Sequence, residues 1–350
     1  MSSNQASPYW IETEDWHTAG EPFRIVSKFP PGFETSGKTV GERRINILEN
    51  PRHPLDFLRQ SLCHEPRGHA DMYGGFITPP DDSGALFGAL FWHKDSFSTA
   101  CGHGTIALGY WAIAHGMLPV PENGTVDVVI DVPSGRVMAR ITMSNNKPVH
   151  AEFVNVLSYQ LAKDVPATAT SRGVDVNVDL VYSGAVFATV DASQLDLEVK
   201  PSNFNDFIKF GREIKASLSK RAHYESYDLY AVIFYNEEDE GKDQGGIVRQ
   251  RNVVAFADGQ IDRSPCGSGS TARATVLLSQ GRLHAAGGSK LVHRSIIGAT
   301  FEADIISEEP SPIDGFKACI PRVRGHANLV GRMNFFIDPT ETLFPGFLLR

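Results

Sequence analysis

Two cysteine-containing stretches of the chain share one pattern. Residues 98–111 read STACGHGTIALGYW and residues 263–276 read RSPCGSGSTARATV. Both contain Cys-Gly-x-Gly-[Thr/Ser]-x-Ala, beginning at Cys101 and at Cys266. In each stretch an apolar, strand-like run precedes the cysteine, and an apolar, helix-like run follows its Gly-rich turn. The pattern therefore predicts that each cysteine lies at the N-terminus of a helix.

The agreement between the two stretches extends in both directions. Phe91 and Phe256 each precede their cysteine by 10 residues, and Gly116 and Gly281 each follow it by 15, where a C-terminal cap belongs. The cysteines are 165 residues apart, close to half of the chain. We therefore expect two similarly built halves related by a pseudo-twofold axis, which would bring the two helix starts face to face.

Two thiols at opposed helix starts suit a particular chemistry. The unpaired N–H groups and positive dipole end of a helix N-terminus lower a thiol pKa from about 8.5 and bind a carboxylate. A small amino acid held there by its carboxylate would have one sulfur on each face of its Cα. One thiolate would remove the α-proton and the opposite thiol would return one, as in a racemase or epimerase without a cofactor. His103 and Asp262 stand close enough in sequence to contact a thiol or the substrate amine.

Composition narrows the class of protein. The chain has 350 residues, 41% of them hydrophobic, and a net charge of −8, which argues against nucleic acid or an anionic membrane as a partner. The first residues lack a signal-peptide pattern and no apolar run is long enough to cross a bilayer, so we expect a cytoplasmic protein. Four cysteines in such a chain do not form a disulfide framework, and Cys63 and Cys319 are expected to be structural.

The remaining sequence fits two α/β halves rich in strands. Alternating runs at 125–143 and 175–192 predict strands and hairpins, and 201–221 predicts an amphipathic helix. Residues 144–153 are the expected boundary between the halves. The charged run 236–246 is expected to be a solvated loop.

Four motifs together carry a family resemblance. CGHGT at 101–105 and DRSPCGSGS at 262–270, with HTAGEP at 17–22 and EPRGHADMYGG at 65–75, resemble the proline racemase family. That family includes proline racemases, hydroxyproline 2-epimerases and trans-3-hydroxy-L-proline dehydratases. The resemblance runs from about Trp16 to the C-terminal PGFLLR, which is nearly the whole chain.

The resemblance implies an α/β (α+β) fold like that of diaminopimelate epimerase. Two pseudo-symmetric domains would each wrap a curved, mostly antiparallel sheet around a central helix, with the active site in the cleft between them. The last segment would return to the first domain. The expected division is residues 1–150 with 335–350, and residues 151–334.

The resemblance also implies roles for individual residues. Cys101 and Cys266 match the catalytic pair, and no cofactor is implied. The residues that match substrate-binding positions are Gly102, His103, Asp262, Gly267, Ser268, Phe256 and, less directly, Tyr73 and Phe91. The other polar motif residues are expected to brace turns and the cleft wall rather than to bind a metal, since no His-x-x-x-His or Cys-x-x-Cys spacing occurs; these are His17, Glu21, Glu65, Arg67, His69 and Asp71.

The choice among family members stays open at this stage. Dehydratases usually replace the second cysteine with threonine, so Cys266 favours a racemase or epimerase. The segments GSGSTAR and GFLLR instead resemble dehydratase versions. Proline and hydroxyproline are both candidate substrates, and a homodimer is a candidate assembly. A non-catalytic amino-acid-binding protein, a thiol redox protein and a cysteine hydrolase are the alternatives from other classes.

Overall fold

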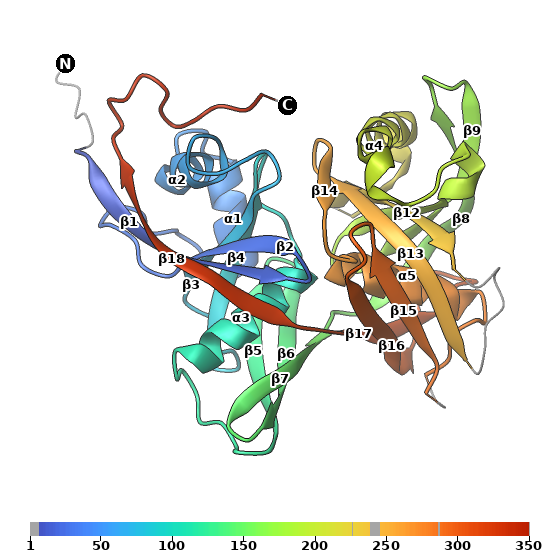
Figure 1. The fold of residues 1–350 in the computed structure, drawn as a ribbon, viewed down its shortest axis with the longest axis horizontal. Coiled ribbons are helices and arrows are strands. Elements are labelled where there is room, and N and C mark those ends of the chain that lie inside the picture. The colour runs from blue at the N-terminus through green and yellow to red at the C-terminus, as the bar shows by residue number, and fades with distance from the viewer. Residues whose placement is uncertain (1–6, 226, 239–245, 286–287, 350) are drawn as a thin grey trace.

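The computed structural model describes residues 7–225, 227–238, 246–285 and 288–349. Within them an eighteen-stranded mixed sheet dominates, and the helices are few (Figure 1). The first half of the chain forms β1 (Tyr9–Thr18), β2 (Glu21–Val26), α1 (Val40–Leu48), α2 (Pro54–Cys63), β3 (Tyr73–Thr78), β4 (Phe87–His93), α3 (Gly102–Ala114), β5 (Gly124–Val132), β6 (Gly135–Ser144) and β7 (Lys147–Val154). The second half forms β8 (Ser158–Ala169), β9 (Val174–Tyr182), β10 (Val186–Asp191), α4 (Phe204–Leu218), β11 (His223–Tyr224), β12 (Tyr227–Glu237), β13 (Ile247–Phe256), β14 (Gln260–Asp262), α5 (Gly267–Ser279), β15 (Lys290–Ser295), β16 (Thr300–Glu309), β17 (Ala318–Gly325) and β18 (Ala327–Ile337).

The strand pairing repeats between the two halves. In the first half, β1 and β2 are antiparallel, β2 and β3 parallel, β3 and β4 antiparallel, and β4 and β5 parallel. In the second half, β9, β10, β12, β13 and β15 follow the same sequence of pairings. Helices α3 and α5 occupy the same place in this scheme, each between the last two of these strands. The predicted α+β fold of two similar halves is confirmed.

Strands near the middle and the end of the chain link the halves. The segment 144–153, expected to be a boundary, mostly forms β7, which pairs with β6 and also with β17 of the second half. At the end of the chain, β18 runs back along β1, from Ala327 beside Thr18 to Ile337 beside Tyr9. Figure 1 shows β18 crossing from the second half to the first. The division into two domains at the expected residues stays a prediction.

Helices α3 and α5 are the buried central helices of the two halves. All α3 residues from Gly102 to Ala112 are buried, as are all α5 residues from Gly267 to Leu278. Both are therefore core helices, although α5 also buries polar side chains, including that of Arg273. Gly116 and Gly281 follow the helix ends with φ of +60° and +73°, so both predicted glycine caps are present.

The other predicted elements also form. The run at 125–143 becomes the β5–β6 hairpin and the run at 175–192 becomes β9 and β10. The amphipathic helix predicted at 201–221 is α4, which buries Phe207, Phe210 and Ile214 against its half of the sheet. Most of the charged run 236–246 lies outside the described residues, because the structure describes nothing from 239 to 245.

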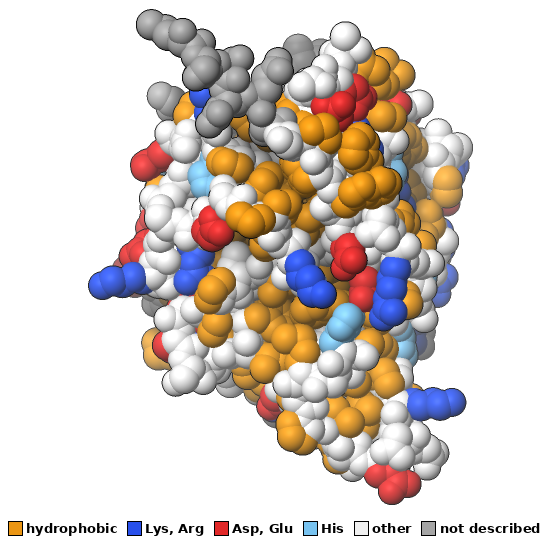
Figure 2. Space-filling view, turned by 90° about the vertical axis from the view of Figure 1, so that its left-hand side faces the viewer, with side chains coloured by type: hydrophobic (Ala, Val, Ile, Leu, Met, Phe, Trp, Pro, Cys, Tyr) orange, Lys and Arg blue, Asp and Glu red, His pale blue; other side chains and the backbone are white. Residues whose placement is uncertain are grey.

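The surface beside β1 carries exposed apolar side chains. Trp10 of β1 and Phe336 of β18 have ring centroids 5.2 Å apart and are 64% and 45% exposed. Figure 2 shows this side of the molecule, where hydrophobic side chains are interspersed with charged ones. Among the described residues, no helix combines the length and the apolar character that a membrane span requires.

Candidate active site

The N-termini of α3 and α5 meet backbone to backbone. A Cβ atom added to Gly102 would lie 2.6 Å from the Cα of Gly267, and one added to Gly267 would lie 2.5 Å from the Cα of Gly102. Real Cβ atoms do not approach other atoms so closely, so only glycine fits at either position. The predicted face-to-face arrangement of the helix starts is present. Two positive dipole ends in contact repel each other, and an anion bound between them relieves that repulsion.

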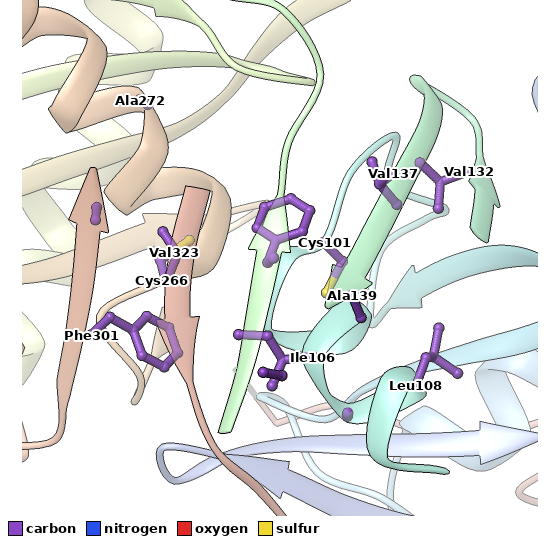
Figure 3. Packing of buried hydrophobic residues seen from close by; sticks show 14 of the residues in the cluster. Cys101, Ile106, Leu108, Val132, Val137, Ala139, Cys266, Ala272, Phe301 and Val323 are labelled. Carbon is purple, nitrogen blue, oxygen red and sulfur yellow. The ribbon is translucent and has the colours of Figure 1, made fainter. Parts of the chain in front are cut away.

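Each cysteine caps its helix through its sulfur. Cys101 Sγ accepts the Gly104 N–H at 3.2 Å, and Cys266 Sγ accepts the Gly269 N–H at 3.3 Å. Figure 3 shows Cys101 at the start of α3 and Cys266 at the turn leading into the helix that carries Ala272. The two caps differ in backbone, since Cys101 is extended with φ −156° whereas Cys266 has φ +64°. A non-glycine residue with positive φ stores strain, and such strain gathers at functional sites.

Both sulfurs face one small cavity between the halves. Its volume of about 20 Å³ leaves room for little more than a water molecule, so the described conformation is closed. A five-membered ring cannot enter without movement of the walls. The lining residues are Tyr73, Ala100, Cys101, Gly102, His103, Phe187, Tyr230, Phe256, Asp262, Cys266 and Ser268.

Burial and a nearby carboxylate favour the protonated form of both thiols. Burial raises the pKa of Cys101 and of Cys266 well above the usual thiol value, and the charge of Asp262 raises both further. The N–H groups of Gly104 and Gly269 lower the pKa of their cysteines, with a smaller effect than burial. A cation bound at Asp262 would remove that carboxylate's effect and favour a thiolate.

Asp262 is fixed in position by its own turn. Its Oδ1 accepts the Ser264 N–H at 2.8 Å and the Ser264 hydroxyl at 2.7 Å, and Ser264 Oγ accepts the Cys266 N–H at 3.0 Å. Burial raises the pKa of Asp262 to about 6, and the bonds from Ser264 oppose this rise. The carboxylate is therefore held beside the second sulfur and is mostly charged at neutral pH.

His103 and the free amide groups complete the polar part of the site. Burial lowers the pKa of His103 to about 3, so the imidazole is neutral, and its Nδ1 lies 3.4 Å from Cys101 Sγ. The first amides of each helix, on Gly102 and His103 and on Gly267 and Ser268, have no intrahelical acceptor. Ser268 Oγ is buried without a hydrogen-bond partner. Unpaired donors of this kind at a helix N-terminus suit a carboxylate.

Aromatic rings form the apolar wall of the cavity. Tyr73 and Phe256 line it as expected, with ring centroids 5.8 Å apart. Phe91 does not line it: the side chain is fully buried one layer away, because the Phe23 ring lies against both Phe91 and His103. The expected ring contact of Phe91 is therefore not supported by the geometry.

Sequence reasoning missed Ala100, Phe187 and Tyr230, which also line the cavity. Ala100 directly precedes Cys101, and that adjacency was the available clue. Phe187 and Tyr230 come from β10 and β12, which pair in parallel beside the site. No sequence motif in either strand indicates that these residues line the cavity. Gly267, by contrast, was predicted but lies behind the lining atoms, where it contacts Gly102.

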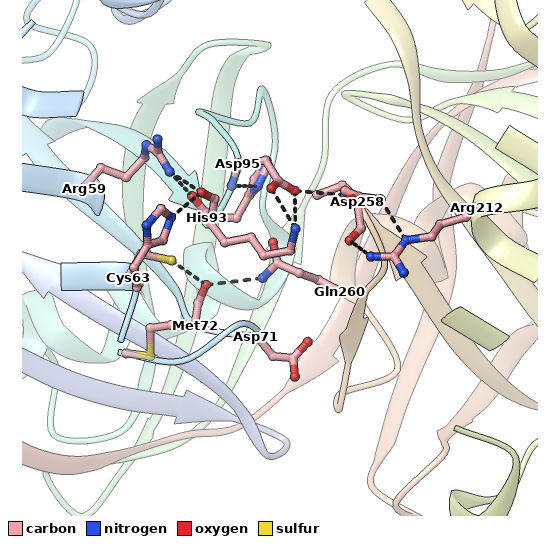
Figure 4. A network of polar contacts seen from close by, with 12 residues as sticks. Arg59, Cys63, Asp71, Met72, His93, Asp95, Arg212, Asp258 and Gln260 are labelled. Carbon is pink, nitrogen blue, oxygen red and sulfur yellow. Dashed lines mark hydrogen bonds and ion pairs between the residues drawn. The ribbon is translucent and has the colours of Figure 1, made fainter. Parts of the chain in front are cut away.

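A chain of polar contacts joins the halves next to the cavity. Asp95 of the first half accepts the Asp258 N–H at 2.9 Å, and the Gln260 side chain donates to Met72 O at 3.4 Å (Figure 4). Further along, Arg263 pairs with Asp71 at 2.8 Å and donates its N–H to Glu21 at 2.7 Å. The strand that carries Asp262 is thus held by carboxylates from the opposite half.

The other polar motif residues brace turns and the cleft wall, as the sequence predicts. His17 and His69 accept backbone N–H groups of Gly20 and Asp71, and Arg67 pairs with Glu341. Glu65 forms a β-bridge with Phe347. No group of three or more His, Cys, Asp or Glu side chains suited to a metal ion occurs in the described part of the chain.

Cys63 and Cys319 stand apart from this site. Cys63 donates to Met72 O at 3.3 Å, and Cys319 lies 3.5 Å from the Thr275 hydroxyl. Burial raises their pKa to about 12 and about 11. Neither sulfur lines the cavity that Cys101 and Cys266 share.

The overall fold is shared with a hydroxyproline epimerase of known structure. The structure matches a crystal structure of a hydroxyproline epimerase from Agrobacterium vitis with bound trans-4-hydroxy-L-proline at a TM-score of 0.85, covering 100% of this chain and 97% of that one. The sequence identity of that pair is 24%, so the match establishes the fold.

Comparison of the sequence with known families identifies the family of this chain. The model of the proline racemase family matches residues 14–348, and the chain belongs to that family. A trans-3-hydroxy-L-proline dehydratase from Bacillus thuringiensis is 37% identical, over 96% of this chain and 97% of the relative. A 3-hydroxyproline 2-epimerase from Burkholderia multivorans is 36% identical, over 97% and 98%. The protein is therefore a member of an enzyme family that holds racemases, epimerases and dehydratases, as the motifs predicted.

Proposed function

We propose that the protein is a cofactor-independent racemase or epimerase that inverts Cα of proline or hydroxyproline by proton transfer between Cys101 and Cys266. One observation carries the proposal. The two cysteines cap helices whose first residues abut, and both sulfurs line the same closed cavity with Asp262. No other cysteine of the chain, Cys63 or Cys319, has this setting.

The proposed reaction moves one proton on each face of the substrate. A thiolate takes the α-proton, the Cα–H bond breaks, and its electron pair spreads into the carboxylate. The thiol on the opposite face then donates its proton to Cα, which inverts the centre. The two sulfurs end with exchanged protonation states, and the next turnover of the same enantiomer requires them to exchange back with solvent.

The surrounding groups bind the substrate and stabilise the negative charge. The paired helix N-termini and the unpartnered Ser268 hydroxyl would receive the carboxylate, where charge grows as the α-proton leaves. Asp262 would receive the ammonium group. This contact has a second consequence, because the charge of Asp262 raises the pKa of both thiols and the ammonium compensates that charge. Substrate binding thus favours formation of the thiolate that attacks it.

The dehydratase is a second candidate, favoured by the 37% identity to a trans-3-hydroxy-L-proline dehydratase. A thiolate would remove the α-proton, the Cα–C3 double bond would form, and the C3–O bond would break with the oxygen leaving as water after protonation. The enamine product would tautomerise to a pyrroline-2-carboxylate. The second cysteine has no required part in that elimination, and its retention favours inversion.

Proton NMR in D2O separates these candidates. The purified protein is incubated without added cofactor with L-proline, trans-4-hydroxy-L-proline and trans-3-hydroxy-L-proline in separate tubes. Loss of the α-proton signal with growth of a new diastereomer, or of D-proline on a chiral column, supports the proposal. Ring-proton changes toward a pyrroline carboxylate identify the dehydratase. Absence of exchange in all three tubes contradicts both, and favours amino-acid binding or thiol redox chemistry.

The proposal also covers the domain arrangement, the cellular compartment and the assembly of the enzyme. The site would lie in the cleft between a domain of residues 1–150 with 335–350 and a domain of residues 151–334. The reducing cytoplasm would keep both thiols available. The homodimer expected from the sequence stays a prediction, which the mass of the protein in solution would test.

A further inference from the structure

The peptide bond between Pro265 and Cys266 is hydrogen-bonded on both sides. The Pro265 carbonyl accepts the Asn252 side-chain N–H at 2.7 Å and the Ser270 hydroxyl at 3.1 Å. On the other side of the same peptide plane, the Cys266 N–H donates to Ser264 Oγ at 3.0 Å. A rotation of this peptide plane would therefore break three hydrogen bonds at once.

The orientation of that peptide plane determines φ of Cys266. The dihedral φ describes rotation about the N–Cα bond, and the atoms beyond this bond are held by α5. There Cys266 O accepts the Ser270 N–H at 2.8 Å, and Cys266 Sγ accepts the Gly269 N–H at 3.3 Å. The resulting φ of +64° is unfavourable for a residue with a Cβ atom and persists only where the surroundings impose it. The bonds to the Pro265 carbonyl thus decide in which direction the sulfur leaves the backbone.

The first half of the chain has no equivalent of Asn252. Asn252 precedes Cys266 by 14 residues, and the residue that precedes Cys101 by the same number is Phe87. The Phe87 side chain has no group that could donate to a carbonyl, and its ring packs edge to face against Trp111. Cys101 has an ordinary extended φ of −156°. The polar side chain therefore occurs in the half whose cysteine is strained.

Asn252 is an unfavourable residue for the stability of the core. Its side chain is 0% exposed, and its Oδ1 has no hydrogen-bond partner among the described residues. A buried polar atom without a partner lowers stability, and a leucine of similar size would remove that penalty. The bond that the Asn252 amide does make goes to the carbonyl next to Cys266. The residue thus supports the turn that carries the sulfur, at the expense of the core.

We propose that Asn252 is a positioning residue for Cys266, which holds the Pro265 carbonyl and so directs the Cys266 sulfur toward the face of Cα opposite Cys101. This inference rests on the proposed function. Without the Asn252 bond, the peptide plane can rotate, φ of Cys266 can relax, and the sulfur moves. Cys101 lies in a separate turn of the other half and keeps its place. Proton transfer then becomes slow at one face of the substrate only.

The test compares the two directions of the reaction. Asn252→Leu removes the donor at nearly constant volume, and both epimers of the accepted substrate are measured with hydrogen or deuterium at Cα. We expect kcat/KM to fall by about 10- to 100-fold, the effect of misplacing a reacting group by up to about 1 Å. The fall is equal in both directions, because an enzyme does not change the equilibrium between the epimers.

The deuterium isotope effect on kcat/KM distinguishes the two faces. For the epimer that Cys266 deprotonates, the isotope effect should rise, because cleavage of the Cα–H bond by the displaced sulfur limits the rate. For the epimer that Cys101 deprotonates, the isotope effect should fall, because the slow step is then donation of the Cys266 proton. A general disturbance of the site would leave both isotope effects at their wild-type values.

Ser295→Ala is the matched control. Ser295 is the partner of Asn252 in the register of β13 and β15, is also 0% exposed, and has an Oγ without a hydrogen-bond partner. Its hydroxyl therefore supports neither Pro265 nor Cys266. The control should keep kcat/KM within about threefold and both isotope effects unchanged. Urea unfolding reports whether each variant is folded, and Asn252→Ala, which removes the same donor without added volume, replaces a leucine variant that does not fold.

Isotope effects that change in opposite directions for the two epimers, in the Asn252 variant but not in the control, support the inference. A loss of activity with wild-type isotope effects means that Asn252 acts on structure alone and overturns it. A variant that matches the wild type also overturns the inference while leaving the proposed function intact. A wild-type enzyme that inverts no substrate contradicts the proposed function, and the inference falls with it.

Discussion

Cys101 and Cys266 hold equivalent places in two copies of one motif, yet their roles in the proposed reaction are complementary. Each must act as base in one direction and as acid in the other, so neither can be replaced. We predict that Cys101→Ser and Cys266→Ser each lower kcat for inversion by at least about 100-fold, because a serine hydroxyl is a far weaker acid than a thiol and does not ionise to the anion that must act as base. The rate of inversion followed by polarimetry or chiral chromatography checks this.

Cys319→Ser is the matched control for both cysteine variants. Its sulfur is also fully buried and contacts a side chain of α5, but it lies outside the cavity. The control enzyme should keep its activity within about threefold. If Cys266→Ser inverted substrate at the wild-type rate, the two-thiol mechanism would be wrong.

Asp262 adds to the effect of burial on the pH at which the thiols ionise. Its negative charge raises the pKa of Cys101 and of Cys266, so Asp262→Asn lowers both values and a thiolate forms at lower pH. We predict that the rising limb of the profile of kcat/KM against pH moves to lower pH in this variant. KM should rise at least tenfold, because the ammonium group loses its partner. Asp258→Asn, on an exposed carboxylate that pairs with Arg212, serves as control. A limb that stays in place or moves to higher pH would contradict the assigned role.

At the scale of elements, the contact between α3 and α5 is the feature that positions the site. A methyl group at Gly102 would overlap the Gly267 backbone and force the helix starts apart. We predict that Gly102→Ala abolishes measurable activity and lowers the free energy of unfolding by about 1–3 kcal/mol, the usual cost of overpacking. Gly331→Ala on β18 is the control, since a Cβ there would meet only Met333 Cε at 3.9 Å. Denaturant unfolding and the NMR exchange assay check both effects, and an active Gly102→Ala enzyme would show that the helix ends need not touch.

The sequence alone predicts the features that depend on residues close together in the chain. Helices α3 and α5, their cysteine caps and their glycine ends follow from residues a few positions apart, and the duplicated motif predicts that the helix starts meet. The contacts of the Tyr73 hydroxyl with the hydroxyls of Ser98 and Tyr230 could not be predicted in this way, because the three residues are far apart in the chain and lie in different elements. Phe91 and Phe256 illustrate the same limit: they match in the repeat, but the Phe23 ring covers only Phe91.

For the molecule as a whole, buried titratable groups set the pH range in which the fold is stable. Burial lowers the pKa of three histidines, His93, His103 and His293, to about 3 each. A histidine with a lowered pKa binds its proton less readily in the folded state than in the unfolded state, where the pKa is about 6.5. Protonation of the unfolded state therefore lowers the free energy of unfolding as the pH falls from about 6.5 toward the folded pKa. At pH 5 each of the three histidines lowers the free energy of unfolding by about 2 kcal/mol relative to neutral pH. Burial raises the pKa of Asp262 to about 6, which acts in the opposite direction and returns about 1 kcal/mol at pH 5.

We expect the three histidines together to outweigh the two buried carboxylates, Asp262 and Glu21, and predict that the free energy of unfolding falls between pH 7 and pH 5. Urea unfolding at the two pH values measures the difference. His293 lies far enough from the sulfurs to be replaced without touching the site, since its Nδ1 is bonded to Ser270 and it does not line the cavity. His293→Asn should therefore reduce the pH difference by about 2 kcal/mol, the share of one histidine, even though the variant is less stable at pH 7. The exposed His284→Gln should leave the difference unchanged. A wild-type protein that gains stability on acidification would mean that the buried carboxylates, Glu21 among them, dominate instead, because their raised pKa values favour the folded state as pH falls.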